Sequence, residues 1–330
     1  MQIENTAEMW YNYLITYLFK ETRMNIEVTR INEGICADPS AYIKDVNADY
    51  MYKLQRIADD IIEHRNEKPV ILLSGPSGSG KTTTALMLEK LLDDSGHETH
   101  TMSMDNYFCP LTEEEKRLSA LGKMDLESPD RVDKKLLNDQ IEAISRCEEI
   151  EIPKYNFKSS TRESSGKKFL RREGELVIFE GIHALNPAVI TVPDSRICKI
   201  YVSVRTRVTC GDILLHPSKV RLMRRMIRDK KFRKRTLRET MNMFHSVEAG
   251  ENKYIMPYKH RSDYDVDTFF SYELSAYRNT LLDQLKEMND VPELEDAVKV
   301  LEALEPLDNK LVTPDSLICE FIGSGQFKYS

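Results

Sequence analysis

Gly75-Pro-Ser-Gly-Ser-Gly80-Lys81-Thr82-Thr83 follows the apolar run 70–73 and fits the pattern G-x-x-x-x-G-K-[ST]. Between a strand and a helix, this pattern predicts a phosphate-binding P-loop. Glycines let several backbone N–H groups converge on one anion, and the following helix adds the positive end of its dipole. The predicted ATP-binding residues are Gly75, Ser77, Gly78, Ser79, Gly80, Lys81, Thr82 and Thr83.

The composition of the 330 residues is that of a protein with a sizeable core, since 41% are apolar and 31% charged. A net charge of −7 argues against bulk binding of nucleic acid. The six cysteines are scattered without metal-ligand spacing, which favours free thiols in a reducing cytosol. The apolar run 13–19 is too short to span a bilayer. We therefore expect a cytoplasmic protein without a membrane partner.

Apolar runs alternate with helical patterns along the central part of the chain. Strands are predicted at 70–73, 99–105, 176–180, 200–204 and 266–270, with helices between them. This alternation predicts an α/β fold of the P-loop NTPase type, a doubly wound, mainly parallel five-stranded sheet with helices on both faces. The segment 150–157 is expected to be a short edge strand, followed by a basic loop at 158–162 and a turn near Gly166.

The predicted organisation has three parts, which are an N-terminal helical extension at 1–67, a P-loop core at 68–272 and a C-terminal helical extension and tail at 273–330. The N-terminal part carries one helical stripe from Trp10 to Leu18 and another from Tyr50 to Ile62. We expect their apolar faces to pack on the core or on a second subunit, which leaves a homo-oligomer open.

Two acids stand at the ends of predicted strands, where groups of an open α/β sheet face the ligand crevice. Asp105 is placed for a base or a metal ligand, although a turn or capping role is an equal alternative. Glu180 ends the apolar run 176–179, as a Walker B-like carboxylate would. With the Thr82 hydroxyl, it is a candidate ligand of Mg²⁺.

The most basic segment is 219–238, in which eleven of twenty residues are Lys or Arg. Arg221, Arg225 and Arg228 recur at helical spacing on one face. Such a face can be solvated or bind nucleic acid, but phosphoryl transfer also needs cations that close over the equatorial oxygens. We expect a lid at about 219–240.

Together these motifs resemble those of the uridine kinase and phosphoribulokinase family over roughly residues 68–270. The similarity is carried, besides the P-loop, by 103–108, 129–130, 153–157, 179–182 and 221–229, in this order. The insertion 209–219 and the ending 314–323 are similar to a longer bacterial branch of nucleoside kinase-like proteins.

The resemblance implies a role for each matching residue. Asp105 would take the proton of the acceptor hydroxyl, Glu180 would organise Mg²⁺, and Lys81 would hold the phosphates of ATP. The lid arginines would be Arg224, Arg225 and Arg228, and the acceptor pocket would be lined by Tyr107, Tyr155, Arg162 and Arg221. The chain departs from the uridine kinases at 126–129, where they carry Phe-Asp-His-Pro, and at Ser160, where they carry His.

We expect an ATP- and Mg²⁺-dependent kinase that phosphorylates a small molecule, foremost the 5′-hydroxyl of a ribonucleoside. A sugar phosphate or another primary alcohol is the alternative acceptor within the same chemistry. From a different class, a nucleotide-dependent switch or a nucleic-acid-associated ATPase is favoured only by the basic segment, which lacks aromatic residues for base stacking beyond Phe232. A catalytically silent relative is the third alternative, although Lys81, Thr82, Asp105 and Glu180 are all present. We expect no nucleic-acid partner.

Overall fold

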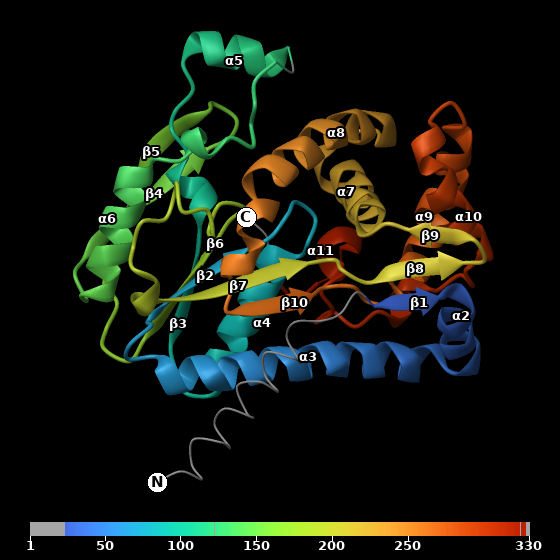
Figure 1. The fold of residues 1–330 in the computed structure, drawn as a ribbon, viewed down its shortest axis with the longest axis horizontal. Helices are drawn as coiled ribbons and strands as arrows, with labels where there is room; N and C mark the ends of the chain where they lie inside the picture. The colour runs from blue at the N-terminus through green and yellow to red at the C-terminus, as the bar shows by residue number, and fades with distance from the viewer. Residues whose placement is uncertain (1–23, 122, 324, 328–330) are drawn as a thin grey trace.

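A computed structural model of the protein describes residues 24–121, 123–323 and 325–327. The helix expected between Trp10 and Leu18 lies outside these residues. Figure 1 shows a central sheet with the long helix α3 running beneath it and a group of C-terminal helices at one side.

The central sheet has five parallel strands, which confirms the fold expected from the sequence. Their order across the sheet is β10-β7-β2-β6-β3. The bounds are Val70–Ser74 for β2, Thr99–Ser103 for β3, Leu176–Glu180 for β6, Ile197–Ser203 for β7 and Tyr264–Asp267 for β10. Because all five run in parallel, their carboxyl ends meet at one edge of the sheet, where a ligand crevice belongs.

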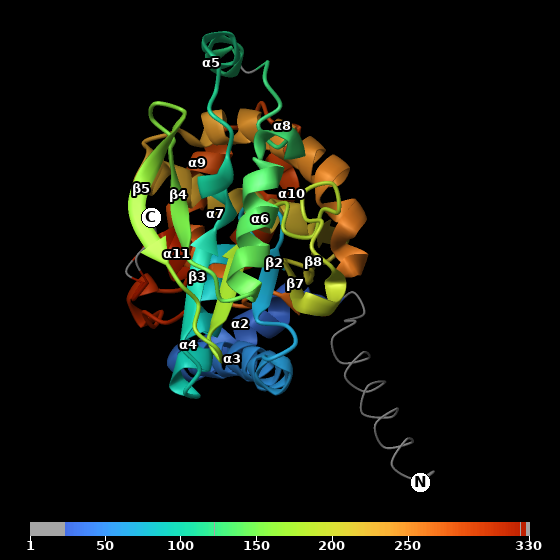
Figure 2. The same ribbon diagram turned by 90° about the vertical axis from the view of Figure 1, so that its left-hand side faces the viewer.

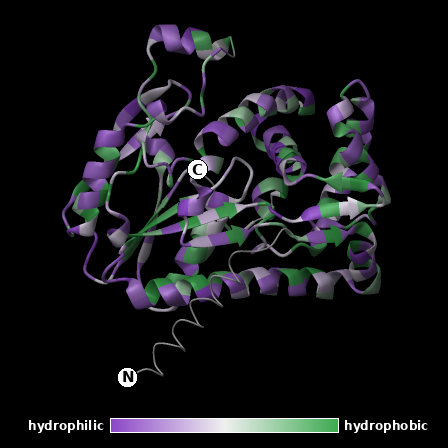
Figure 3. Ribbon diagram, in the orientation of Figure 1, coloured by the Kyte–Doolittle hydropathy of each residue, from purple (hydrophilic) through white to green (hydrophobic). Residues whose placement is uncertain are grey.

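Both faces of the sheet are buried, as its continuous apolar runs predict. In β2, Ile71 and Leu73 belong to one core cluster and Val70 and Leu72 to another. The first is closed by α3 (Pro39–His64) and α4 (Lys81–Asp94), and the second by α6 (Lys134–Ser145). Figure 2 shows α6 on the face opposite α3 and α4, and Figure 3 shows the apolar residues concentrated in the strands between them.

The N-terminal extension belongs to the same core as the P-loop helix. Asp38 begins α3 by accepting hydrogen bonds from the N–H groups of Ser40 and Ala41. The predicted stripe between Tyr50 and Ile62 lies within this helix and faces α4. A buried hydrogen bond of 2.7 Å joins the hydroxyls of Tyr50 and Thr84, so α3 is fixed directly to the helix that follows the P-loop.

A small second sheet was not expected from the sequence. Its order is β1-β8-β9, formed by Asn25–Glu27, Arg207–Cys210 and Ile213–Leu215. It packs against α2 (Val28–Ala37) and α10 (Glu295–Ala303). The insertion at 209–219 therefore joins the N-terminal extension to the C-terminal helices.

The structure corrects the prediction of an edge strand at 150–157. It is β4 (Ile150–Asn156), but it pairs with β5 (Thr161–Phe169) in a separate antiparallel hairpin and not with the central sheet. The turn expected near Gly166 is likewise absent, since Gly166 lies inside β5 with a positive φ of 64°. The mostly polar, exposed β5 has no apolar alternation that could have revealed it.

The remaining helices enclose the carboxyl edge of the sheet and the C-terminal side. They are α5 (Glu113–Ala120), α7 (Pro217–Arg233), α8 (Leu237–Tyr254), α9 (Glu273–Glu287) and α11 (Cys319–Ile322). The C-terminal helical segment is divided by the short helix η5 (Pro292–Leu294) between α9 and α10. Other short 3₁₀ helices are η1 (Met104–Tyr107), η2 (Pro129–Arg131), η3 (Asp194–Arg196), η4 (Met256–Arg261) and η6 (Asn309–Leu311). Among the described helices, none has both the length and the apolar character needed to cross a bilayer.

Ile57→Ala tests whether the N-terminal extension folds as part of the core. Ile57 is fully buried where α3 faces α4, and truncating such a side chain costs about 2–5 kcal/mol. We expect a single urea transition at lower denaturant concentration, followed by circular dichroism. Two separate transitions would show that the extension unfolds by itself.

Candidate active site

The P-loop joins β2 to α4 and needs its glycines for close approach. A Cβ atom on Gly75 would lie 2.0 Å from the carbonyl oxygen of Val202 in β7. Gly78 and Gly80 have φ values of 77° and 85°, a left-handed conformation that other residues seldom adopt. These glycines let the loop curl against the sheet, so that its N–H groups face the carboxyl edge.

Unsatisfied polar groups around the loop indicate an anion site. The Ser79 Oγ and the Nε atoms of Arg225 and Arg228 are buried without a hydrogen-bond partner among the described residues. Burial, and then the neighbouring Arg228, lowers the pKa of Arg225 to about 10. Buried donors without partners and crowded cations are both relieved by a bound phosphate. Lys81 donates to the Pro76 carbonyl oxygen at 3.2 Å, which keeps its ammonium group at the loop.

Asp105 and Glu180 are brought together by a second close approach. Asp105 lies in η1, whose first turn is capped by the Ser103 hydroxyl, and Glu180 ends β6. A Cβ atom on Gly181 would lie 2.7 Å from the Cβ of Met104, so only glycine lets η1 and β6 meet this closely. Both predicted acids therefore lie at the carboxyl edge of the sheet beside the P-loop.

Both carboxylates have raised pKa values, and the charge of Asp105 acts on Glu180. Burial raises the pKa of Glu180 to about 7, and the negative charge of Asp105 adds to this effect. The pKa of Asp105 is also raised, first because the surrounding protein displaces water, while Lys81 and Arg233 oppose the shift. A carboxylate with a raised pKa is a better proton acceptor. Two acids held close together also favour a cation between them.

Three arginines of the basic segment surround the P-loop from α7. Arg221 donates to the Ser77 carbonyl oxygen at 2.9 Å, and Arg225 donates to the Ser77 hydroxyl. Arg228, one helical turn further, pairs with Glu320 at 3.2 Å. The helix that carries them is largely buried, so the first part of the expected lid is packed into the core. The boundary of the lid itself remains a prediction.

Arg224 lies differently from the lid residue that the resemblance implied. Its side chain is fully buried, and it forms an ion pair of 2.7 Å with the equally buried Glu273 of α9. It also donates to the carbonyl oxygens of Gly78 and Thr268. All of these contacts are with protein groups, so Arg224 holds the P-loop against β10 and α9 and is not presented to a ligand.

The predicted acceptor side is also rearranged. Tyr107 was expected to line the pocket, but its ring is fully buried and its hydroxyl donates to Gln140. The reason is the 3₁₀ turn of η1, which directs Tyr107 into the core. Its neighbour Phe108 instead meets Tyr155 and Phe157 edge to face, at centroid distances of 5.7 and 6.3 Å.

These three aromatic rings form a cluster that sequence reasoning found only in part. The Tyr155 hydroxyl accepts a hydrogen bond from Arg131, whose guanidinium lies 5.2 Å from the centre of the Phe108 ring. Phe157 remains mostly exposed. The predicted Arg162 is held by Asp133 at 2.8 Å. Tyr155 is itself buried, so only the exposed Phe157 and the half-buried Phe108 could stack on a planar ligand.

Three further residues of the site were missed. Burial, followed by the charge of Glu251, raises the pKa of Glu127 to about 7. His183 is buried and neutral, with its pKa lowered to about 4, and neither ring nitrogen has an ordinary hydrogen bond within the described chain. The third is Arg233, whose positive charge opposes the rise in the pKa of Asp105. Glu127 lies in the segment that departs from the uridine kinases, and that departure was the one available signal.

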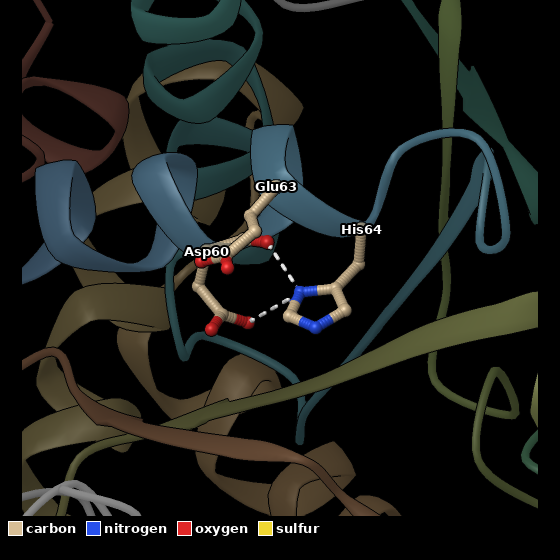
Figure 4. Close-up of side chains that lie close together, drawn as sticks. All are labelled: Asp60, Glu63 and His64. Carbon is tan, nitrogen blue, oxygen red and sulfur yellow. Dashed lines mark hydrogen bonds and ion pairs between the residues drawn. The ribbon is translucent and has the colours of Figure 1, made fainter. Parts of the chain in front are cut away.

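A cluster of His and acidic side chains outside the site has a structural explanation. Asp60, Glu63 and His64 lie at the end of α3, on the side opposite the P-loop edge (Figure 4). The His64 Nδ1 is 2.9 Å from the Asp60 carbonyl oxygen and 3.7 Å from its carboxylate. Asp60 also accepts a hydrogen bond from Tyr264. These contacts close the last turn of α3 and connect it to β10.

A P-loop with an acid at the end of each of two neighbouring strands and arginines above it defines a P-loop kinase. The chain belongs to the Phosphoribulokinase / Uridine kinase family, whose model matches residues 70–273. It is therefore a phosphotransferase that acts on a hydroxyl group of a small molecule.

Individual relatives agree with this family. The uridine kinase of Lactobacillus helveticus is 33% identical over 60% of this chain and 85% of its own length. That of Staphylococcus haemolyticus is 29% identical over 59% and 84%. A solved structure described as a possible uridine kinase from Bacillus stearothermophilus is 15% identical, with a TM-score of 0.38 over 65% of this chain and 100% of that chain.

Arg224→Ala should destabilise the protein strongly. Removing one partner of a buried ion pair leaves the other charge buried without compensation, at a cost of about 3–5 kcal/mol. We expect a correspondingly lower free energy of unfolding in urea. Arg228→Ala should lower it less, because the Arg228 side chain is 17% exposed and water can partly compensate for its loss. Equal losses in the two variants would contradict the distinction drawn between these arginines.

Glu180→Gln should change the pH dependence of stability. The pKa of Glu180 is raised from 4.5 to about 7, so the folded state holds its proton more tightly than the unfolded state. Stability from this group is therefore present below pH 4.5 and is lost as the pH rises towards 7. Without divalent ions, we expect Glu180→Gln to gain stability relative to wild type between about pH 5 and about pH 8. The free energies of unfolding of the two proteins would be measured in urea at both pH values. If their difference is the same at both, the raised pKa of Glu180 is contradicted.

Proposed function

We propose that this kinase transfers the γ-phosphoryl group of ATP to the 5′-hydroxyl of a ribonucleoside or a close analogue. The observation that carries the proposal is the shared edge at which Asp105, Glu180 and the P-loop meet, beside an aromatic cluster in which Phe157 is exposed and Phe108 half-buried. The first group suits phosphoryl transfer, and the second suits a planar base.

The residues divide the work between them. The P-loop N–H groups and Lys81 would hold the triphosphate, with Arg225 and Arg228 close enough to balance charge on the moving phosphoryl group. Asp105 would orient the acceptor hydroxyl and take its proton as the new P–O bond forms. Its raised pKa favours this step because the proton acceptor is then better matched to neutral pH.

The site suits Mg²⁺ by the chemistry of its donors. Thr82 offers a hydroxyl and Glu180 a carboxylate, which are oxygen ligands of the kind that Mg²⁺ prefers. Glu180, held beside Asp105 with a raised pKa, would regain an ordinary pKa next to a cation. Thr82 and Glu180 would hold the ion, which would supply positive charge to offset that of the phosphates.

The acceptor is proposed from the aromatic cluster and from relatives that are named uridine kinases. Phe108, Tyr155 and Phe157 offer ring faces and edges, and Arg131 adds a charge over Phe108. Ser160 lies at the tip of the β4-β5 hairpin, with a positive φ of 54°. Hydrogen bonds to the base would therefore depend on other groups. Glu127 is one candidate, since the charges of Asp105 and Lys81 act on it, and His183 is another, since the charge of Lys81 acts on it.

The same proposal places the protein in the cytoplasm. All six cysteines are free thiols in the structure, the state that a reducing compartment maintains.

Asp105→Asn tests the reaction directly. Loss of a general base lowers the rate by roughly 10²–10⁴-fold, while the P-loop and its affinity for nucleotide remain. We expect ATP binding within about twofold of wild type but little phosphorylated product. Products would be identified by mass after incubation with Mg-ATP and a panel of nucleosides, ribulose 5-phosphate, pantothenate and simple sugars.

The panel also separates the acceptor classes. Turnover with one nucleoside well above the rate without acceptor supports the proposal. Turnover only with a sugar phosphate moves the assignment to that class. ATP hydrolysis that no acceptor stimulates and that survives in Asp105→Asn would sink the kinase assignment in favour of a switch or ATPase.

A further inference from the structure

The C-terminal ending 314–323, to which the sequence assigned no role, packs directly on the P-loop. Leu317 is fully buried, and a Cβ atom on Gly80 would lie 2.8 Å from one of its methyl groups. In α11, Glu320 accepts a hydrogen bond of 2.7 Å from the Thr83 hydroxyl and pairs with Arg228 at 3.2 Å. One carboxylate thus holds both a P-loop side chain and an arginine of α7.

A second carboxylate approaches the loop from the opposite side. Glu251 of α8 accepts a hydrogen bond of 2.7 Å from the backbone N–H of Ser77. It also forms an ion pair of 2.7 Å with Arg221, which in turn donates to the Ser77 carbonyl oxygen. The Glu251 side chain is almost completely buried. A P-loop N–H and an arginine therefore share one buried carboxylate.

The groups that these acids occupy are those suited to phosphate. Backbone N–H groups of the loop, hydroxyls at the start of its helix and arginines above it bind phosphate oxygens, and a carboxylate satisfies the same donors with a similar charge. We propose that Glu251 and Glu320 compete with phosphate groups for these donors and that nucleotide binding must displace them. This inference rests on the proposed binding of ATP at the P-loop and adds two residues that set its affinity.

Electrostatic repulsion favours displacement of Glu251 and Glu320 by the phosphates over their remaining in place beside them. Glu251 and Glu320 already act on neighbouring acids, since Glu251 contributes to the raised pKa of Glu127 and Glu320 to that of Glu180. A triphosphate would add further negative charge to this group of acids. Like charges held within a few ångströms in a poorly hydrated site repel one another strongly. The lower-energy arrangement is one in which phosphate oxygens replace the carboxylates on the arginines.

The packing shows which part can move. Phe321 is fully buried, with the guanidinium groups of Arg224 and Arg228 at 5.1 and 5.9 Å from the centre of its ring. Leu317 is equally buried. These two apolar residues would keep the ending in place while the Glu320 side chain rotates away from Thr83. The segment would then loosen locally without leaving the domain.

Glu320→Gln tests the inference because it removes the charge and keeps an oxygen that can accept from Thr83. We expect Mg-ATP to bind about five-fold more tightly than to wild type, since Arg228 no longer has to be released from a carboxylate. The matched control is Glu302→Gln, which removes an exposed acid of α10 that pairs with Lys286. Affinities would be measured by isothermal titration calorimetry, and the fold would be checked by thermal unfolding.

Glu251→Gln leaves Arg221 buried beside a neutral partner and can unfold the protein. Hydrogen exchange of the wild-type chain therefore serves as a second measurement. We expect amides of 314–323 to exchange faster when Mg-ATP is bound, because Glu320 is released.

Three outcomes would overturn the inference. In the first, Glu320→Gln binds Mg-ATP as wild type and Glu302→Gln do, or more weakly. In the second, the ending becomes more protected when nucleotide binds, which would make Glu320 a support of the nucleotide site. In the third, wild type itself binds no Mg-ATP, and the proposed function then fails as well, whereas the first two outcomes leave it intact.

Discussion

The buried ion pair between Arg224 and Glu273 connects the parts of the molecule on which the nucleotide site depends. Through Arg224, α7 holds the Gly78 carbonyl oxygen of the P-loop and the Thr268 carbonyl oxygen at the end of β10. Through Glu273, the same pair reaches α9 and the Tyr277 hydroxyl. Both charges are out of reach of water, so each depends on the other for its compensation. The P-loop is thus fixed from outside its own sequence motif.

This anchoring allows the rest of the site to be electrostatically crowded. Burial raises the pKa values of Asp105, Glu127 and Glu180 and lowers that of Arg225, and neighbouring like charges add to the shifts of Glu127, Glu180 and Arg225. Such an arrangement costs stability. Under the proposed function, a nucleotide with its metal ion would offset these charges, because phosphates suit the arginines and a cation suits the acids.

The sequence predicted the parts of the structure that depend on local pattern. The strands β2 and β6 follow from continuous apolar runs and β3 from its alternating pattern, and the P-loop follows from glycines whose close contacts the structure confirms. The small sheet could not be predicted, because β1 and β9 have three residues each and form only when distant segments meet. The exposed strand β5 was not predicted for a related reason, since a polar strand shows no alternation of apolar residues.

At the candidate site, residue types were predictable but orientations were not. Asp105 and Glu180 follow strand ends, so the sheet itself determines their position. Tyr107 and Phe108 are adjacent and both aromatic, and only the 3₁₀ geometry of η1 decides which ring is buried. Arg224 and Arg225 are likewise neighbours in a helix, about 100° apart around its axis. One faces α9 and the core, and the other faces Ser77, a difference that depends on what packs against α7.

The helix α3 and the ending 314–323 help to keep the P-loop in place, although the chain departs from the uridine kinases elsewhere. The departures from the uridine kinases lie at 126–129 and at Ser160, in the acceptor loop and the β4-β5 hairpin, whereas the P-loop is held by α3, α7, α9 and the ending 314–323. Tyr50 fixes α4 from one side and Glu320 holds Thr83 of the same helix from another. Because Tyr50 and Glu320 lie in other segments than 126–129 and Ser160, substitutions there leave these two contacts in place. The additional segments of this chain are therefore best understood as supports of the nucleotide half of the site.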